Sequence, residues 1–203
     1  LLPTKSYTSD DFNLYFNCSN HDFNHNATDD YLDILNGAKN DAKNHPKYDP
    51  AYVVGGYPTE NKGVCTDVIW RAFREAGLSL RDMVNQDIKN NPDDYCIDTI
   101  DKDIDFRRVK NLHVFFYKYG QCLTTDINNI GAWQAGDIVI FGDDEHIGII
   151  SDRRNRKGHV YVLHNGGQPN REEDYFKRKR PVAHYRINFE KLEKANLLIE
   201  FQE

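Results

Sequence analysis

Helical and strand-like segments occupy separate parts of this chain, and their order is what most constrains the fold. In the first part, apolar residues recur at helical spacing over residues 30–45, 65–76, 80–90 and 109–119. After Trp133, short β-branched and aromatic runs are separated by Gly and Asp, as is typical of antiparallel strands. Helices followed by strands predict an α+β fold, with the helices packed against one antiparallel sheet.

The same patterns predict the division of the chain. The 203 residues are enough for one domain with a substantial core. Residues 1–27 are polar and irregular, so we expect an N-terminal arm there, followed by a single domain over 28–203. This domain has a helical part over 28–130 and a sheet part over 131–203. In the sheet part we expect strands over 137–141, 147–151, 159–164 and 182–187, a helix over 188–195 and an edge strand over 197–201.

Charge and hydropathy exclude several classes of function. The formal net charge of -6 argues against a nucleic-acid binder. The basic run 177–180 comes shortly after the acidic run 172–174, so we expect the basic run to be a solvated loop. Since there is no run of about 18 apolar residues, no segment is expected to span a membrane.

The start of the chain and its cysteines bear on localisation. The chain begins with Leu1 and its only methionine is Met83, so we expect that a leader or anchor has been removed. A secreted or cell-envelope location follows, while a cytoplasmic one stays open. The four cysteines form no CxxC pair, which argues against a zinc ribbon or a thioredoxin-like site. A disulfide between Cys96 and Cys122 stays open, because connectivity cannot be deduced from sequence.

Cys65 stands at the start of an amphipathic helix, directly after the turn marked by Gly63. At a helix start, the free backbone N–H groups and the positive end of the helix dipole favour a thiolate over a thiol. This placement is typical of a nucleophilic cysteine. The alternative is a buried structural cysteine, since free cysteines often behave as small core residues.

Two histidines stand where a general base and its orienting group are needed. His146 opens one predicted strand and His164 closes the next, so a tight antiparallel pairing would bring both to the same end of the sheet. A helix N-terminus packed against that end would present Cys65 to His146. The alternative is that each histidine only bonds a neighbouring carbonyl group.

Several segments carry a family resemblance. Residues 52–56 and 63–67 read Tyr-Val-Val-Gly-Gly and Gly-Val-Cys-Thr-Asp, residues 133–141 read Trp-Gln-Ala-Gly-Asp-Ile-Val-Ile-Phe, and residues 146–149 read His-Ile-Gly-Ile. In this order, with His164 after the next strand, they resemble the motifs of NlpC/p60-type cell-wall cysteine peptidases. The resemblance implies a papain-like fold, with a catalytic cysteine at a helix N-terminus and a Cys-His-His triad.

A closer resemblance, over about residues 31–187, is to the uncharacterised bacterial domain-of-unknown-function family numbered 1287, which belongs to the same papain-like superfamily. Residues 48–52, 105–112 and 184–186 also match its pattern.

The chain departs from the NlpC/p60 pattern around the thiol, where Val64, Thr66 and Asp67 replace Asp, Ser and Gly, and in a helical insert over 78–129. Substrate contacts are therefore expected to differ.

The resemblance implies a role for each matching residue. Cys65 would be the nucleophile, His146 the base and later the acid to the leaving amine, and His164 the orienting group. Asn165 is a rival orienter, because papain-like enzymes can use an amide there. The backbone N–H of Cys65 would help to hold the oxyanion.

Three further residues are candidates for contacts with the oxyanion or the substrate. Tyr52 matches a tyrosine that lines the NlpC/p60 site, although a packed loop tyrosine would look the same. Asp67 and Asp152 could hold substrate peptide, with a local ion pair or a turn cap as the alternative. No cofactor and no bound metal ion are implied.

The leading hypothesis is a thiol hydrolase that cleaves amide bonds through an acyl-enzyme, with peptidoglycan stem peptides as substrate and endopeptidase or amidase activity. Three alternatives are an acyltransferase with the same triad, a non-catalytic cell-envelope binding module, and a zinc site formed by Cys65, His146 and His164. The sequence leaves the oligomeric state undetermined, and a monomer is the simplest expectation.

Overall fold

The structure is a computed structural model that describes residues 6–202. Its centre is a six-stranded antiparallel sheet. In spatial order the strands are β3 (Gly120–Cys122), β8 (Pro181–Ile187), β4 (Ile138–Phe141), β5 (His146–Arg154), β6 (Val160–Leu163) and β7 (Glu172–Glu173). A small parallel pair, β1 (Lys47–Tyr48) and β2 (Lys62–Gly63), lies outside this sheet.

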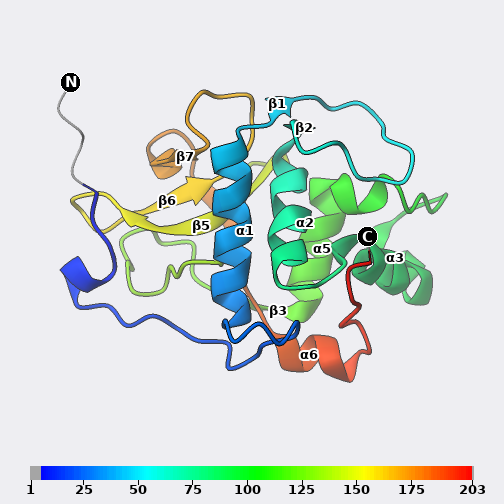
Figure 1. Ribbon diagram of the computed structural model, residues 1–203, viewed down its shortest axis with the longest axis horizontal. Coiled ribbons are helices and arrows are strands. Elements are labelled where there is room, and N and C mark those ends of the chain that lie inside the picture. Colours follow the sequence, from blue (N-terminus) through cyan, green and yellow to red (C-terminus); the bar gives the residue numbers. More distant parts are fainter. Residues whose placement is uncertain (1–5, 203) are drawn as a thin grey trace.

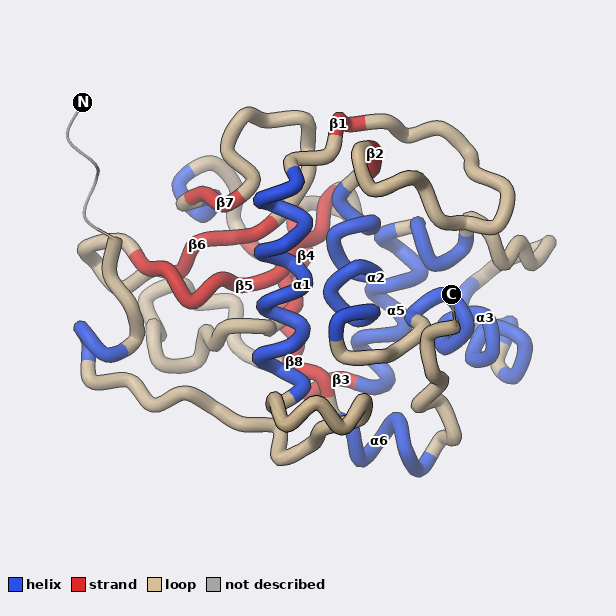
Figure 2. The backbone as a smooth tube through the Cα atoms, in the orientation of Figure 1, coloured by secondary structure: helices blue, strands red, loops and turns tan. Residues whose placement is uncertain are grey.

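The helices gather on one side of the strands. They are α1 (Asp30–Asn44), α2 (Cys65–Glu75), α3 (Leu80–Asn90), α4 (Pro92–Tyr95), α5 (Val109–Tyr119) and α6 (Phe189–Lys194). The chain also forms three short 3-10 turns, η1 (Asp10–Phe12), η2 (Asp105–Arg107) and η3 (Tyr175–Lys177), the last of which packs on the opposite face of the sheet. Figure 1 shows α1 and α2 side by side in front of the strands. Figure 2 shows α3 and α5 on the far side of α2 from α1.

The close approach of α1 and α2 depends on small residues. A Cβ atom at Gly37 of α1 would lie only 2.7 Å from the Cα atom of Ala72 on α2, so the two backbones meet where neither residue carries bulk. The N-terminus of α1 is capped by Asp29, whose carboxylate accepts a hydrogen bond from the Tyr31 N–H at 3.0 Å.

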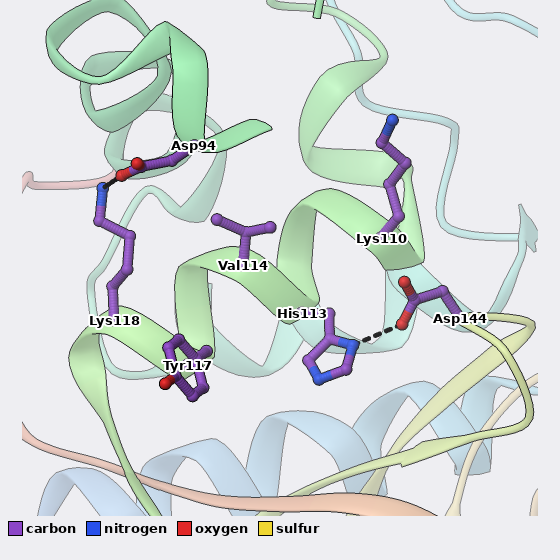
Figure 3. Close-up of a pocket in the computed structure, with 7 residues that line it drawn as sticks. All are labelled: Asp94, Lys110, His113, Val114, Tyr117, Lys118 and Asp144. Atoms are coloured by element: carbon purple, nitrogen blue, oxygen red, sulfur yellow. Dashed lines mark hydrogen bonds and ion pairs between the residues drawn. The ribbon is translucent and has the colours of Figure 1, made fainter. Parts of the chain in front are cut away.

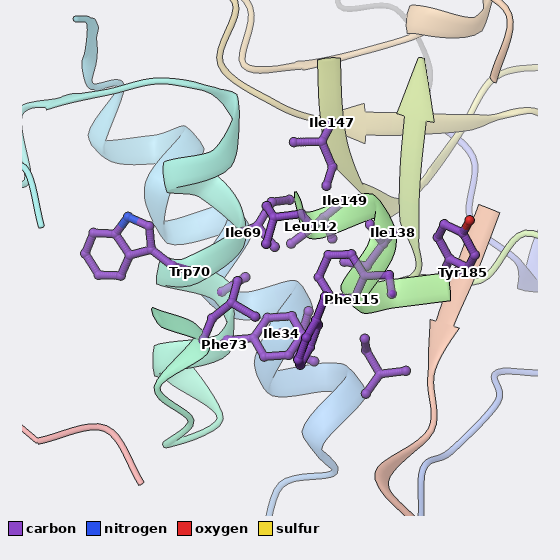
Figure 4. Packing of buried hydrophobic residues seen from close by; sticks show 14 of the residues in the cluster. Ile34, Ile69, Trp70, Phe73, Leu112, Phe115, Ile138, Ile147, Ile149 and Tyr185 are labelled. Carbon is purple, nitrogen blue, oxygen red and sulfur yellow. The ribbon is translucent and has the colours of Figure 1, made fainter. Parts of the chain in front are cut away.

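The main core lies between the helices and the sheet. Figure 4 shows Ile69 and Phe73 of α2 and Phe115 of α5 facing Ile138 and Ile149 of the sheet. These side chains are fully buried, so the helices are held on the sheet by apolar packing.

A second, smaller core covers the opposite face of β4. Val139 and Phe141 point into it, whereas their neighbours Ile138 and Ile140 belong to the main core, because successive side chains of a strand alternate between faces. Trp133 closes this side and stacks on the ring of His184 at 3.8 Å.

The structure confirms the predicted order of helices followed by an antiparallel sheet. The predicted helix over 109–119 coincides with α5, and the predicted helix over 80–90 coincides with α3. Residues 197–201 do not form the expected edge strand, since only an isolated bridge joins Leu78 and Glu200.

Four strands were not predicted: the small pair β1 and β2, which forms in a segment expected to be a loop, and β3 and β7 of the central sheet. β3 lies within the part of the chain expected to be helical, where it pairs with the edge of β8, and β7 lies in the acidic run, for which no strand was expected.

The N-terminal arm is largely irregular from residue 6 onwards, apart from η1 and a bridge between Tyr7 and Arg154, and its first five residues lie outside the described part. Cys96 and Cys122 are both free and exposed, so the structure contains no disulfide between them. Within residues 6–202, no helix combines the length and the apolar character needed to cross a bilayer.

Candidate active site

Cys65 is the first residue of α2 and lies against the beginning of β5. β6 pairs with no residue of β5 before Ile149, so the first residues of β5 leave one edge of the strand open. The backbone N–H of Ile147, together with that of Thr66, interacts with the Cys65 sulfur. The thiol is half-buried. The nucleophile candidate therefore sits directly beside the residue that follows His146.

The two histidines expected at this end of the sheet are in direct contact. The Nε2 atom of His146 lies 2.8 Å from the Nδ1 atom of His164, and the two rings meet edge to face. The antiparallel register of β5 and β6, which pairs Ile149 with Leu163, brings them together. His146 thereby keeps its Nδ1 atom for another partner.

A carboxylate lies behind this pair. The Oε1 atom of Glu173, on β7, is 3.1 Å from the Nε2 atom of His164. The ring of Tyr175 packs against both imidazoles, at 5.5 Å from His146 and 4.4 Å from His164. Neither Glu173 nor Tyr175 was identified from the sequence.

Glycine residues allow this close arrangement. A Cβ atom at Gly148 would lie 3.0 Å from the backbone oxygen of Leu163 and 3.3 Å from the Cβ atom of His164, so β6 can approach β5 only because Gly148 has no side chain. A Cβ atom at Gly166 would lie 3.5 Å from Cε1 of His146, which places the loop after β6 next to that ring.

The turn that leads into His146 is held from both sides. His113 of α5 contacts Asp144 of the turn at 2.5 Å, and Lys179 forms an ion pair with Glu145. Figure 3 shows the His113–Asp144 contact at one end of a surface hollow of about 410 Å³ along α5. The residues that line this hollow include none of the predicted site residues.

Burial keeps the three central groups neutral. It raises the pKa of the Cys65 thiol to about 11. It lowers the pKa of His146 to about 4, and the positive charges of Lys179 and Arg178 lower the pKa of His146 further. Burial and the neighbouring His146 lower the pKa of His164 to about 3. At neutral pH the thiol and both imidazoles are therefore uncharged, so the thiolate expected at the helix start is not the resting state, because burial outweighs the helix N-terminus.

Asp67 is placed differently from the expectation that it contacts substrate. Its side chain is fully buried and accepts hydrogen bonds from the Val64 N–H at 2.7 Å and from Trp70 Nε1 at 2.8 Å. Arg107 adds a two-pronged ion pair at 2.8 and 2.9 Å. The expectation of substrate contact is therefore wrong for this structure, and the alternative of an ion pair and helix cap is correct.

Asn165 does not orient His146. Its Nδ2 atom donates to the backbone oxygens of Pro46 and Gly63, at 3.2 and 3.1 Å, and its Oδ1 atom accepts from the Gly167 N–H. It fastens the loop after β6 to the turn that precedes Cys65. The group in contact with His146 is His164.

The side-chain contacts recorded for Tyr52 and Asp152 are with residues other than Cys65, His146 and His164. The exposed Tyr52 hydroxyl donates to the Asp101 carboxylate at 3.1 Å, so no contact in the structure supports its expected role at the oxyanion. Asp152 forms an ion pair with Lys39 at 2.6 Å. It stands six residues beyond His146 on β5, which is about 20 Å at the rise of an extended strand. No contact in the structure therefore supports the expected role of Asp152 with substrate at Cys65.

The chain is similar to known sequences over most of its length. Residues 35–187 match the family described as "Domain of unknown function (DUF1287)". The uncharacterized protein YijF of Escherichia coli (strain K12) is 37% identical over 166 residues, which cover 76% of this chain and 80% of that protein. No solved structure matches the chain. Since both similarities extend over well above half of its residues, the chain belongs to the DUF1287 family.

Proposed function

We propose that this protein is a papain-like thiol hydrolase of the NlpC/p60 type, which cleaves amide bonds through an acyl-enzyme on Cys65. One observation carries the proposal: the thiol lies at a helix start beside the residue that follows His146, and His164 holds the other nitrogen of the His146 ring. These contacts support a nucleophile, a base and an orienting group in that order, as acyl transfer requires.

The resting charges indicate how the reaction begins. Because the thiol and the imidazole are neutral, the proton moves as the sulfur attacks. The Cys65 sulfur forms a bond to the amide carbon while Nδ1 of His146 accepts the thiol proton. His146 then gives this proton to the leaving nitrogen as the C–N bond breaks, leaving a thioester on Cys65.

Water completes the cycle. His146 removes a proton from a water molecule, the resulting hydroxide adds to the thioester carbon, and the C–S bond breaks with return of the proton to sulfur. Backbone N–H groups at the start of α2 are suited to hold the negative oxygen in both halves, since the first N–H groups of a helix have no partner within it.

As substrate we propose the stem peptides of peptidoglycan, cleaved by an endopeptidase or amidase activity. The support is the motif resemblance to NlpC/p60 enzymes, from which the chain departs beside the thiol at Thr66 and Asp67. A substrate of this kind would place the protein outside the cytoplasm, in the cell envelope or secreted.

The test compares wild-type protein with Cys65→Ala on purified peptidoglycan. The wild type is expected to release amino groups and muropeptides, and Cys65→Ala is expected to release none. Cys122→Ala is the matched control, since Cys122 is a free, exposed cysteine at the opposite edge of the sheet. Equal release by the wild type and Cys65→Ala would refute the wall-hydrolase proposal.

An acyltransferase would use the same groups, with an amine in place of water in the second half. Mass spectrometry of products formed with added amines separates the two, because a transferase joins the acyl group to the amine.

A binding module would need no base. Iodoacetamide should alkylate Cys65 about tenfold faster in the wild type than in His146→Ala if the base is functional. Equal rates would favour the binding module.

The zinc alternative has weaker geometric support. His146 and His164 point ring nitrogens at each other across 2.8 Å, whereas two ligands of one zinc ion each direct a nitrogen to the metal at about 2.0 Å with a tetrahedral angle between them. Metal analysis of protein purified without an affinity tag tests this alternative, and stoichiometric zinc would overturn the triad assignment.

A further inference from the structure

The carboxylate of Glu173 ends a chain of side-chain contacts that begins at His146 and passes through His164. Its Oε1 atom faces Nε2 of His164 at 3.1 Å, and its Oε2 atom accepts from Arg178 at 3.0 Å. β7 holds it in place, because Leu163 pairs with Glu172, and the His164 N–H donates to the backbone oxygen of Arg171. The His164 ring and the Glu173 carboxylate are therefore both held by backbone pairing between β6, the residue after it, and β7.

These contacts determine where the ring protons lie. An ionised carboxylate can only accept a hydrogen bond, so Nε2 of His164 must carry its hydrogen. A neutral imidazole has one such hydrogen, so Nδ1 of His164 is an acceptor, and the partner that faces it, Nε2 of His146, must donate. The lone pair of His146 is then on Nδ1, the nitrogen left for the thiol proton.

We propose that Glu173 is a positioning residue of this site, which sets the tautomers of His164 and His146 so that Nδ1 of His146 is free to act as the base. The inference rests on the proposed function, to which it adds a fourth member. Glu173 acts through the two rings and does not touch the substrate.

The other polar neighbour of His164 does not compete for this role. The Nε2 atom of Gln168 lies 3.3 Å from Nδ1 and 3.2 Å from Nε2 of His164, so it stands over the ring and outside the plane in which the nitrogens donate and accept. Its two hydrogens are directed to the backbone oxygens of His164 and Asn170. Gln168 therefore leaves the choice of tautomer to Glu173.

The charge state of Glu173 matters, because a protonated carboxyl group can donate. Burial raises the pKa of Glu173, and the Arg178 guanidinium opposes this rise. The ion pair with Arg178 thereby favours the ionised, accepting form that the proposal requires.

Nitrogen-15 NMR of the histidine rings tests the proposal in the resting protein. His146→Gln and His164→Gln variants identify the two signals. In the wild type both rings are expected to carry hydrogen on Nε2. A hydrogen on Nδ1 of His146 in the wild type would overturn the proposal, whatever the activity on peptidoglycan.

Glu173→Gln is the decisive variant, because its amide can donate as well as accept and so permits the reversed tautomers. We expect part of the histidine signal to shift from the Nε2–H tautomer to the Nδ1–H tautomer. Alkylation of Cys65 by iodoacetamide, measured by mass spectrometry of the peptide that contains Cys65, should slow about tenfold or more. Glu173→Asp keeps the carboxylate and should restore part of the rate. Wild-type tautomers and rates in Glu173→Gln would overturn the proposal.

Glu172→Gln is the matched control. Glu172 neighbours Glu173 on β7 but contacts Ser151 and Arg153, away from the histidines, so both readouts should match the wild type. If Glu172→Gln slowed alkylation as much as Glu173→Gln, the effect would belong to β7 as a whole and the proposal would fail. Because neither readout uses peptidoglycan, a failure of the substrate assignment is distinguishable from a failure of this inference.

Discussion

His146 and His164 share a hydrogen bond, with Nε2 of one ring 2.8 Å from Nδ1 of the other. The consequence is that the second histidine, and not the neighbouring Asn165, determines the orientation of the first. Asn165 is buried, and its amide nitrogen donates hydrogen bonds to two backbone oxygens. It therefore stabilises the loop next to the site.

The first prediction concerns His164→Ala. Loss of the His164 ring leaves Nε2 of His146 without its partner, and the base then turns freely. We expect turnover of peptidoglycan to fall about 100-fold, with little change in KM, since His164 is buried and therefore not expected to contact substrate. His159→Ala is the control, because His159 precedes the other end of β6. Equal turnover by the two variants would contradict the orienting role.

The second prediction concerns acid stability. Burial lowers the pKa of His146 to about 4 and that of His164 to about 3, from 6.5. At pH values between 6.5 and these lowered pKa values, the unfolded chain binds more protons at the two histidines than the folded protein does. The free energy of unfolding therefore falls as the pH is lowered from about 6.5 to about 3, and the loss is complete below that range.

Urea unfolding from about pH 7 to about pH 4 measures this effect. The comparison is with the double variant His146→Gln, His164→Gln, which lacks the two groups but keeps the carboxyl groups that titrate in the same range. The wild type should lose stability more steeply than the double variant. Parallel curves would contradict the assignment of buried, neutral histidines.

The elements with strong local patterns could be predicted from the sequence. α1, α2, α3 and α5 each carry an apolar face at helical spacing, and β4, β5, β6 and β8 are β-branched runs bounded by Gly or charged residues.

β3 and β7 carry no such pattern, because they are two or three residues long and exist through pairing with longer neighbours. Their formation depends on tertiary context that local propensity does not contain.

The candidate site shows the same division. Cys65, His146 and His164 could be identified from the sequence, because a helix start and two successive strand ends fix their places. Glu173 could not be identified, because the path of the loop over residues 164–171 determines which residue lies beside His164. Asp67 did have a usable signal: an acidic residue three positions after Val64, the N-cap, is half of a capping box.

The third prediction concerns the buried pair of Asp67 and Arg107, whose side chains are 0% and 2% exposed. Asp67→Asn leaves the Arg107 charge buried without its partner and also weakens the cap of α2. We expect a loss of about 3 kcal/mol in the free energy of unfolding, measured in urea. Asp152→Asn, which breaks the exposed pair with Lys39, should cost less than about 1 kcal/mol. Similar losses in both variants would show that Asp67 does not anchor the helix.

The fourth prediction tests whether the spacing of β5 and β6 sets the site. In Gly148→Ala, the new Cβ atom would lie 2.6 Å from Cγ1 of Val162 and 3.0 Å from the backbone oxygen of Leu163, so β6 must move away. Because β6 leads directly into His164, this displacement should weaken the contact with His146. We expect a stability loss of about 1–3 kcal/mol and slower alkylation of Cys65.

Gly131→Ala is the control for that change, since its Cβ atom would meet only Cδ2 of Leu14, at an ordinary 3.5 Å. Its stability and its alkylation rate should match those of the wild type. A Gly148→Ala protein that lost stability but alkylated at the wild-type rate would separate the two effects. The close approach of the strands would then stabilise the sheet without positioning His164, and the contact between the histidines would have to be maintained by β7 and the loop that follows β6.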